Sequence, residues 1–221
     1  MDSMKQLSPV PLSARQVGKN KKNKKANQVA VSEIYLDGKL KKADLIDEGE
    51  KSYGIFMHSL ILSNYAEVMK ISSEEASIIG DEYEKAIFQF TTSKGFDKNL
   101  IESIAPKVDE LTFGTGDRIN VSTHLINEKM RIISKGTPEK LLRRCSYILL
   151  DSRFVKITRK VYKEVSSVLF EMLIRCQNVY AIAIKDITQN APLANQDHYV
   201  SDMTLVAFVG LDRMNLQPSL G

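Results

Sequence analysis

Hydrophobic and polar positions follow two different periods along the chain, and together they predict a mixed fold. Apolar residues recur at helical spacing in three stretches, residues 53–69, 82–94 and 161–176. Alternating or wholly apolar runs of strand length occupy six others, residues 29–36, 108–113, 118–125, 129–134, 179–184 and 203–211. Residues 126–128 alone separate the third and fourth of these runs, which is typical of a hairpin. We therefore expect an α+β fold with a mostly antiparallel sheet flanked by helices.

The most informative motif is Ser134-Lys135-Gly136-Thr137-Pro138-Glu139. The strand expected at 129–134 ends next to Lys135, which is followed by a turn that contains Gly136. A helix is expected from Thr137 to about Cys145. Proline favours the first helical position, because its missing N–H would be unpaired there anyway. Lys135 would thus end a buried strand, where a fixed cation can meet a ligand. On local geometry alone, a solvated lysine beside a turn is the alternative reading.

Composition indicates a globular protein with reduced cysteines. The chain has 221 residues, of which 43% are apolar, so one domain or a domain with an appendage is expected. No apolar run approaches the ~18–20 residues that span a bilayer, and the N-terminus lacks the apolar core of a secretory signal. Cys145 and Cys176 lack a Cys-x-x-Cys spacing, so we expect buried, reduced thiols at helical positions of a cytosolic protein.

The net charge of +4 comes from the N-terminal segment. Residues 1–28 contain seven bases and one acid, which leaves 24 bases and 26 acids, a net charge of −2, in the remainder. Basic tails contact phosphates or anionic lipid, so a nucleic-acid or membrane-surface binder is one alternative function. No aromatic residue interleaves with the lysines, and a solvated extension is favoured instead. We divide the chain into a disordered basic tail at 1–27, a domain at 28–213 and a short extension at 214–221.

Several familiar kinds of chemistry are absent from the sequence. His58, His124 and His198 are scattered without ligand-spaced Cys or Glu, so no protein metal site is expected. The sequence contains neither a P-loop motif nor a Gly-x-Ser-x-Gly nucleophile motif. Gly114–Asp117 lacks a third glycine and opens no helix, so we interpret it as a turn. No catalytic residues are therefore assigned.

Five short segments together resemble one known family. Lys135-Gly-Thr-Pro-Glu139 is similar to a Lys-Gly-Ala-Pro-Glu signature, and Phe113 with Arg118 five positions later resembles a phenylalanine–lysine pair. The segments 80–87, 179–185 and 205–212 resemble a Gly-[Asp/Glu]-x-Thr-Glu-x-Ala-Leu motif and two buried strands. Order and spacing agree across about residues 27–213. In these respects the chain resembles the nucleotide-binding (N) domain of P-type cation-transporting ATPases.

The resemblance implies ATP as the ligand and gives each matching residue a role. Phe113 would stack on the adenine, Glu84 would accept a hydrogen bond from its amino group, and Lys135 would sit deep in the pocket with Gly136 beside it. Arg118 would supply a second cation for phosphate, and Asn178 would lie on the phosphate side. Magnesium would arrive only with the nucleotide. The domain at 28–213 would then be a nucleotide-binding domain.

Each of these residues also has a plainer reading. Phe113 is a strand-end aromatic that fits a core. Glu84 stands three positions after Asp81, the spacing of a helix capping box. Arg118 fits a solvated strand end. The resemblance favours ligand binding over these readings.

The chain also departs from the family pattern. The family often carries arginine where this chain has Asn178, and Tyr83 and Asn120 replace a threonine and a methionine. The phosphorylated Asp-Lys-Thr-Gly-Thr segment would precede Asn27 and is not there. We therefore expect a cytoplasmic domain that presents ATP to the phosphorylation and membrane domains of a parent ATP-hydrolysing pump, and that does not hydrolyse ATP alone. The alternative is an interaction protein that kept the fold and lost the nucleotide.

Overall fold

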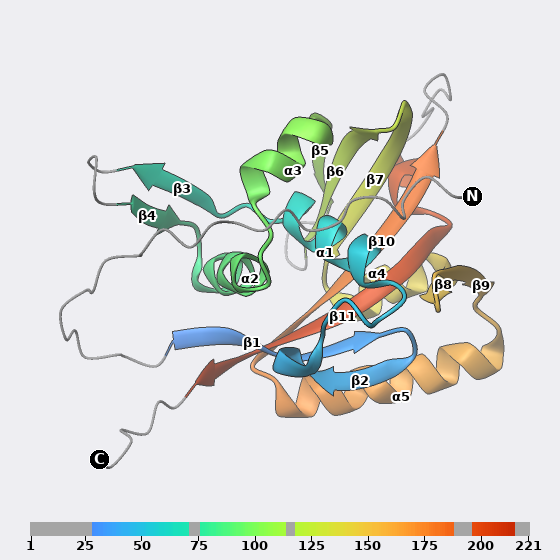
Figure 1. The fold of residues 1–221 in the computed structure, drawn as a ribbon. Helices are drawn as coiled ribbons and strands as arrows, with labels where there is room; N and C mark the ends of the chain where they lie inside the picture. The colour runs from blue at the N-terminus through green and yellow to red at the C-terminus, as the bar shows by residue number, and fades with distance from the viewer. Residues whose placement is uncertain (1–27, 71–75, 114–117, 188–195, 215–221) are drawn as a thin grey trace, which may run out of the picture.

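A nine-stranded sheet forms the centre of the molecule in the computed structural model, which describes residues 28–70, 76–113, 118–187 and 196–214. Figure 1 shows helices packed against this sheet and a small hairpin projecting beside it. The strands of the main sheet are β1 Gln28–Leu36, β2 Lys39–Lys42, β5 Lys107–Phe113, β6 Ile119–Ile126, β7 Lys129–Gly136, β8 Cys145–Leu150, β9 Arg153–Lys156, β10 Asn178–Ile187 and β11 Met203–Met214. The hairpin consists of β3 Glu67–Lys70 and β4 Ala76–Ile79.

The sheet is antiparallel at every pairing except one. Its main path runs β2-β1-β11-β10-β7-β6-β5, and β8 pairs with β11 in parallel and with β9 antiparallel. β11 is the longest strand and holds three neighbours, because β8 pairs with its first residues and β1 with its second half. The expected α+β class with a mostly antiparallel sheet is confirmed.

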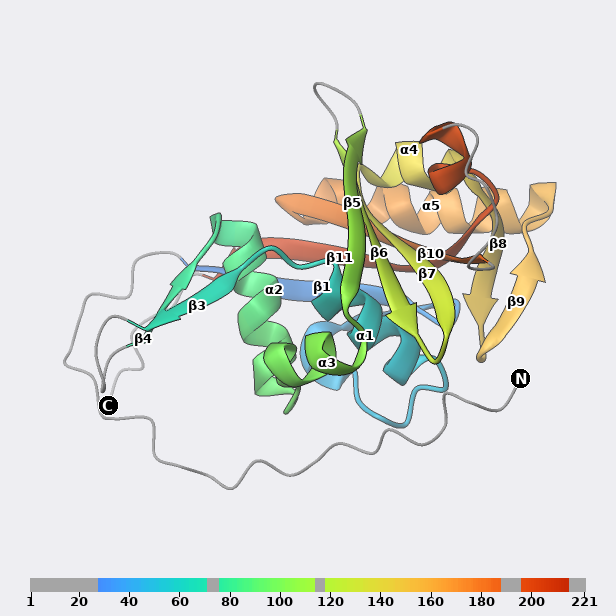
Figure 2. The same cartoon turned by 90° about the horizontal axis from the view of Figure 1, so that it is seen from above.

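Helices cover both faces of the sheet and create two hydrophobic cores (Figure 2). On one face lie α1 Tyr53–Leu62, α2 Glu82–Ser93 and α3 Lys98–Ile104. Their core includes Phe56, Leu60, Ile87, Ile133, Ile182 and Val209. On the other face lie α4 Pro138–Arg143, α5 Arg159–Arg175 and the short 3₁₀ helix η2 Gln196–Val200. Their core includes Ile119, Ile132, Leu141, Leu169, Ala181 and Phe208. Alternate residues of β7 and β10 thus enter opposite cores, as a strand buried on both faces requires.

The first helix is shorter than its apolar pattern predicts. We expected a helix over 53–69, but α1 ends at Leu62 and residues 67–70 form β3. Asn64 explains the break. Its side-chain amide donates to the main-chain oxygen of Glu84 at 2.9 Å, and its side-chain oxygen accepts from the Ala66 N–H at 2.9 Å. Such bonds to the backbone compete with helical ones and turn the chain.

The region around the first cysteine also differs from expectation. The helix predicted to reach Cys145 ends at Arg143, and Cys145 begins β8, while Cys176 follows the last residue of α5. Cys145 is nevertheless buried, and this burial raises the pKa of its thiol to about 12. Cys176 is only half-buried. The helix α3, the strand β2, and the β8–β9 hairpin were not anticipated.

Some expectations concern residues that the structure does not describe. The basic tail at 1–27, the turn at 114–117 and residues 215–221 of the extension lie outside the described ranges. Within those ranges, none of the helices combines the length and apolar character that a bilayer crossing requires.

Candidate functional site

Lys135 lies at the centre of the candidate site, inside the sheet rather than at its edge. It is the penultimate residue of β7, between Asn120 of β6 and Ile182 of β10. Its side chain points to the same face as Ile133, two residues earlier, and is 1% exposed. A lysine buried this deeply requires a partner for its charge.

Glu84 supplies that partner from the first turn of α2. The Nζ atom of Lys135 donates to both carboxylate oxygens of Glu84, at 2.5 and 2.8 Å. The main-chain N–H of Tyr65 donates to the same carboxylate at 2.9 Å. Asp81 caps the helix, because its Oδ1 accepts from the N–H groups of Tyr83 and Glu84 at 2.9 and 2.8 Å. The carboxylate of Glu84 therefore faces the sheet and not the helix start, so the capping-box reading does not describe it.

Tyrosine rings enclose the ion pair. Nζ of Lys135 lies 5.3 Å from the ring centre of Tyr65 and 5.8 Å from that of Tyr180, within the range of cation–π attraction. Tyr83 meets Tyr180 edge to face, with ring centres 6.4 Å apart. Burial lowers the pKa of Lys135, and the charge of Glu84 partly opposes that shift. Burial, with Asp81 and Glu84 nearby, raises the pKa of Tyr180 to about 12, so its phenol is neutral at ordinary pH.

Phe113 lies on the other face of the sheet. It pairs with Ile119, while Thr112 pairs with Asn120, which in turn pairs with Lys135. Residues directly opposite each other share a face, so Thr112 and Lys135 share one face and Phe113 the other. Phe113 accordingly packs against the core that contains Ile119.

The remaining expected residues lie near the end of β7. Gly136 has no room for a side chain, since a Cβ there would be 2.4 Å from the carbonyl oxygen of Arg118 and 2.8 Å from the Cα of Ile119. This close approach explains the glycine of the motif. The Arg118 side chain is exposed, and its carbonyl accepts a weak hydrogen bond from the Thr137 N–H at 3.4 Å. Asn178 begins β10 and lies two residues before Tyr180, on the same face of the strand.

The structure thus gathers Glu84, Lys135 and Asn178 on one face, and adds three residues that the sequence reading missed. These are Asn64, Tyr65 and Tyr180. Tyr180 stood inside one of the resembling strands, and only the pairing of β10 with β7 reveals that it flanks the lysine. Asn64 and Tyr65 carried no sequence signal beyond the interruption of an apolar run.

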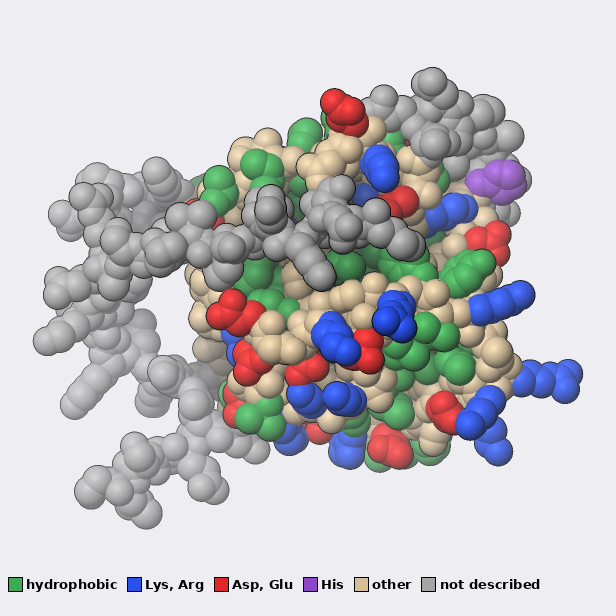
Figure 3. Space-filling view, turned by 45° about the vertical axis from the view of Figure 1, so that its right-hand side comes forward, with side chains coloured by type: hydrophobic (Ala, Val, Ile, Leu, Met, Phe, Trp, Pro, Cys, Tyr) green, Lys and Arg blue, Asp and Glu red, His purple; other side chains and the backbone are tan. Residues whose placement is uncertain are grey.

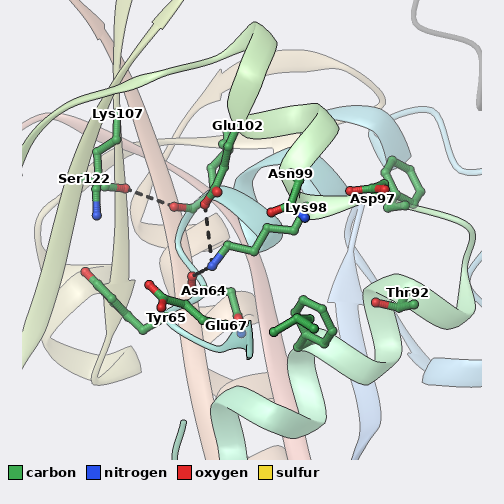
Figure 4. A pocket seen from close by; sticks show the side chains of 14 residues that line it. Asn64, Tyr65, Glu67, Thr92, Asp97, Lys98, Asn99, Glu102, Lys107 and Ser122 are labelled. Carbon is green, nitrogen blue, oxygen red and sulfur yellow. Dashed lines mark hydrogen bonds and ion pairs between the residues drawn. The ribbon is translucent and has the colours of Figure 1, made fainter. Parts of the chain in front are cut away.

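A separate cavity of about 460 Å³ is lined by Tyr65 and by residues of α2, α3, β5 and β6. Figure 4 shows Tyr65, Lys98, Glu102 and Lys107 around it. Lys98 Nζ donates to the main-chain oxygens of Asn64 and Ala66, at 2.7 and 2.9 Å, and lies 3.5 Å from Glu102. None of Phe113, Lys135, Gly136, Glu84, Arg118 and Asn178 lines this cavity. Tyr65 borders both places, because it lines the cavity and its ring centre lies 5.3 Å from Nζ of Lys135.

On the face seen in Figure 3, acidic and basic side chains are interspersed, with apolar patches between them. In the described part of the chain, no cluster of three or more His, Cys, Asp or Glu side chains is arranged to hold a metal ion.

Comparison with known proteins gives the family directly. Residues 53–214 match the family model described as "P-type ATPase, cytoplasmic domain N". The chain belongs to this family, and the resemblance noted from its motifs is confirmed.

The curated relatives are much longer proteins. The chain is 22% identical to calcium-transporting ATPase 1 of Bacillus cereus over 84% of its own length and 20% of that protein's. It is 23% identical to calcium-transporting ATPase lmo0841 of Listeria monocytogenes, over 85% of this chain and 21% of the relative. The sodium/potassium-transporting ATPase subunit alpha-A of Artemia franciscana is 27% identical over 57% of this chain and 14% of the relative. The chain thus spans about a fifth or less of the length of these relatives.

Proposed function

We propose that this chain is the ATP-binding cytoplasmic domain of a cation-transporting pump, and that it presents ATP to a phosphorylation domain of the parent protein. The observation that carries the proposal is the meeting of Lys135 and Glu84 on one sheet face, beside Tyr180. A cation, a carboxylate acceptor and an aromatic ring are the groups that an adenine nucleotide needs. Membership of the N-domain family supports the same function.

Binding would exchange the internal ion pair for contacts with the nucleotide. Glu84 would accept from the adenine amino group, and the released ammonium of Lys135 would face an acceptor on the nucleotide. Arg118, exposed immediately before β6, has the fork geometry that suits phosphate. Base stacking and the two cations would contribute favourable binding free energy, and breaking the Lys135–Glu84 ion pair would cost part of it. The balance corresponds to an ATP affinity of roughly millimolar to tens of micromolar. Such weak binding suits a domain that must release ATP after delivering it.

One observation favours a second function. Lys135 is 1% exposed and already has a carboxylate and two aromatic rings as partners, and Asn178 supplies no charge. If the Lys135–Glu84 pair only stabilises the fold, the domain would not bind ATP. It would then be an interaction protein that retains the N-domain fold and has lost nucleotide binding.

An NMR titration separates the two functions. With ATP, we expect saturable shifts of amide signals around Lys135, Glu84 and Tyr180, and Lys135→Met should weaken the response. The dispersion of the spectrum checks that the variant is folded. No saturable shift at several millimolar ATP would overturn the ATP-binding proposal and leave the interaction protein.

A further inference from the structure

The cavity beside α2 and α3 has the size of a ligand site, and the proposed function makes no use of it. Its volume is about 460 Å³, whereas small-molecule sites in proteins measure about 300–1,000 Å³. The turn after α1 and parts of α2, α3, β3, β5 and β6 form its walls (Figure 4). None of the residues assigned to the nucleotide lines it. The cavity is therefore a candidate site for a different ligand.

One part of the lining is apolar and aromatic. It consists of the side chains of Leu62 and Val68 and the rings of Phe88 and Phe96. Phe96 also meets Tyr53 edge to face, with ring centres 5.9 Å apart, which restrains its ring. An occupant with an apolar body would lose contact with water here. Aromatic faces also attract an ammonium group that lies above them.

The two lysines of the lining are already engaged. The Nζ atom of Lys98 donates to the main-chain oxygens of Asn64 and Ala66, at 2.7 and 2.9 Å. Lys107 donates to the carboxylate of Glu110. An anionic ligand would have to compete with these acceptors, so the lysines do not favour an anion.

The carboxylates of the lining outnumber its lysines. Glu67, Asp97 and Glu102 line the cavity with the two lysines. Asp97 is used as the cap of α3, since it accepts from the Leu100 N–H at 3.2 Å. Glu102 lies 3.5 Å from Nζ of Lys98, which is longer than the ~2.7–2.9 Å of a charged hydrogen bond. Its side chain is 43% exposed, so its oxygens can accept from a cationic donor.

Ser122 adds a buried polar group to the same cavity. It lies in β6 and is 3% exposed. Its hydroxyl oxygen is 3.5 Å from the main-chain oxygen of Leu62, whereas O–H···O bonds measure ~2.5–3.0 Å. A buried hydroxyl with so long a bond gains from a closer partner. Its oxygen can accept from an N–H group while its proton stays directed at Leu62.

We propose that this cavity binds a small organic ammonium ion with an apolar body. The charged nitrogen donates to Glu102, with Ser122 as a further acceptor, and the body lies against Phe88 and Phe96. The proposal goes beyond ATP binding and does not depend on it.

Benzylamine, which is protonated at neutral pH, is the probe, added to the ¹⁵N-labelled chain and followed by NMR. Benzyl alcohol and benzoate carry the same ring with a neutral and an anionic group. Benzylamine should cause saturable shifts at the amides of Tyr65, Thr92 and Glu102. It should bind at least about fivefold more tightly than either analogue, because a charged donor meets a carboxylate.

Glu102→Gln removes the charge at a partly exposed position and should weaken benzylamine binding about 3- to 10-fold. Glu171→Gln is the matched control, since Glu171 is an exposed residue of α5, on the other face of the sheet. It should leave the affinity within about twofold, as expected for a distant site. The dispersion of each spectrum checks that the variant is folded.

Several outcomes would overturn the proposal. Equal affinities for the three probes would show an apolar pocket without preference for charge, and tighter binding of benzoate would show an anion site. Saturable shifts confined to residues outside the lining would place the probe elsewhere. No saturable shift at about 20 mM benzylamine would show that the cavity does not bind this class of ligand. The comparison of probes on the unmodified chain is independent of any folding defect in Glu102→Gln.

Discussion

Lys135 and Glu84, 51 positions apart in the chain, form an ion pair in which the lysine is 1% and the carboxylate 8% exposed. Both charged groups lose their hydration on burial, so each is stabilised mainly by the other. The pair links α2 to β7, and the stability of the fold should therefore be sensitive to substitution of either residue. Removal of one partner leaves the other buried without compensation. This dependence makes the pair testable by stability alone, without any ligand.

Lys135→Met should lower the free energy of unfolding by about 3–5 kcal/mol, because Glu84 would keep its charge in a buried position. Urea unfolding followed by circular dichroism measures this loss. The double variant Lys135→Met with Glu84→Gln should lose less than the sum of the two single variants, with a coupling of about 0.5–3 kcal/mol. Strict additivity would show that the two side chains do not depend on each other.

Gly136→Ala should destabilise the fold by about 1–3 kcal/mol, the usual cost of forcing atoms into a packed site. The added Cβ would lie 2.4 Å from the Arg118 carbonyl oxygen, so two neighbouring strands must separate. Gly54→Ala is the matched control, since a Cβ there meets nothing within 4 Å and the residue lies in α1. The control should be neutral or stabilising by up to ~1 kcal/mol. Thermal or urea unfolding that ranks the two variants the other way would contradict the close approach of β6 and β7.

Asp81→Ala should cost about 0.5–2 kcal/mol, because the first turn of α2 would lose the acceptor for two N–H groups. Asp81→Asn should restore most of that stability, since asparagine caps helices about as well as aspartate. Urea unfolding of both variants tests the cap. If the capping turn also fixes Glu84, Asp81→Ala should shift the amide signals of Tyr65 and Lys135, and Asp81→Asn should shift them less.

His124 should make the fold sensitive to mild acid. Its side chain is 1% exposed, and its Nδ1–H donates to the carbonyl of Ala105 at 2.9 Å. Burial lowers the pKa of His124 below its ordinary value of 6.5, although the Ala105 contact opposes the shift. The unfolded chain therefore binds a proton that the folded chain does not, and stability falls as the pH drops below about 6.5. The contribution of one histidine to the slope is at most about 1.4 kcal/mol per pH unit.

His124→Gln should flatten this slope, as measured by urea unfolding at several pH values between about 5 and 7. His58, whose pKa burial also lowers, should sustain part of the remaining slope. An unchanged profile in His124→Gln would show that His124 titrates alike in the folded and unfolded chains.

Local patterns were sufficient for the long periodic elements. The strands β1, β6, β7, β10 and β11 and the helices α2 and α5 lie where the apolar periods predicted them, apart from a few residues at their ends. These elements are defined by neighbours within one or two turns or one strand, which is information the sequence carries directly. The family resemblance followed from motifs inside the same elements.

Elements whose boundaries depend on contacts with distant parts of the chain could not be predicted from the apolar pattern. The break after Leu62 depends on a bond from Asn64 to Glu84, 20 positions away. The helix α4 gives way at Cys145 to β8, a strand that exists because it pairs with β11 and β9. Apolar spacing alone does not encode such partners.

In the candidate site, too, some features could be predicted from the sequence and others depend on tertiary contacts. The sequence by itself determined which charged and aromatic residues the motifs contain, including Lys135, Glu84 and Phe113. Only the tertiary structure decided that Lys135 and Glu84 meet, that Tyr180 stands beside them, and that Phe113 faces away. The physical reason is strand register. A strand alternates its side chains between faces, so a shift of a single residue in the pairing of β5 with β6 would move Phe113 to the face of Lys135.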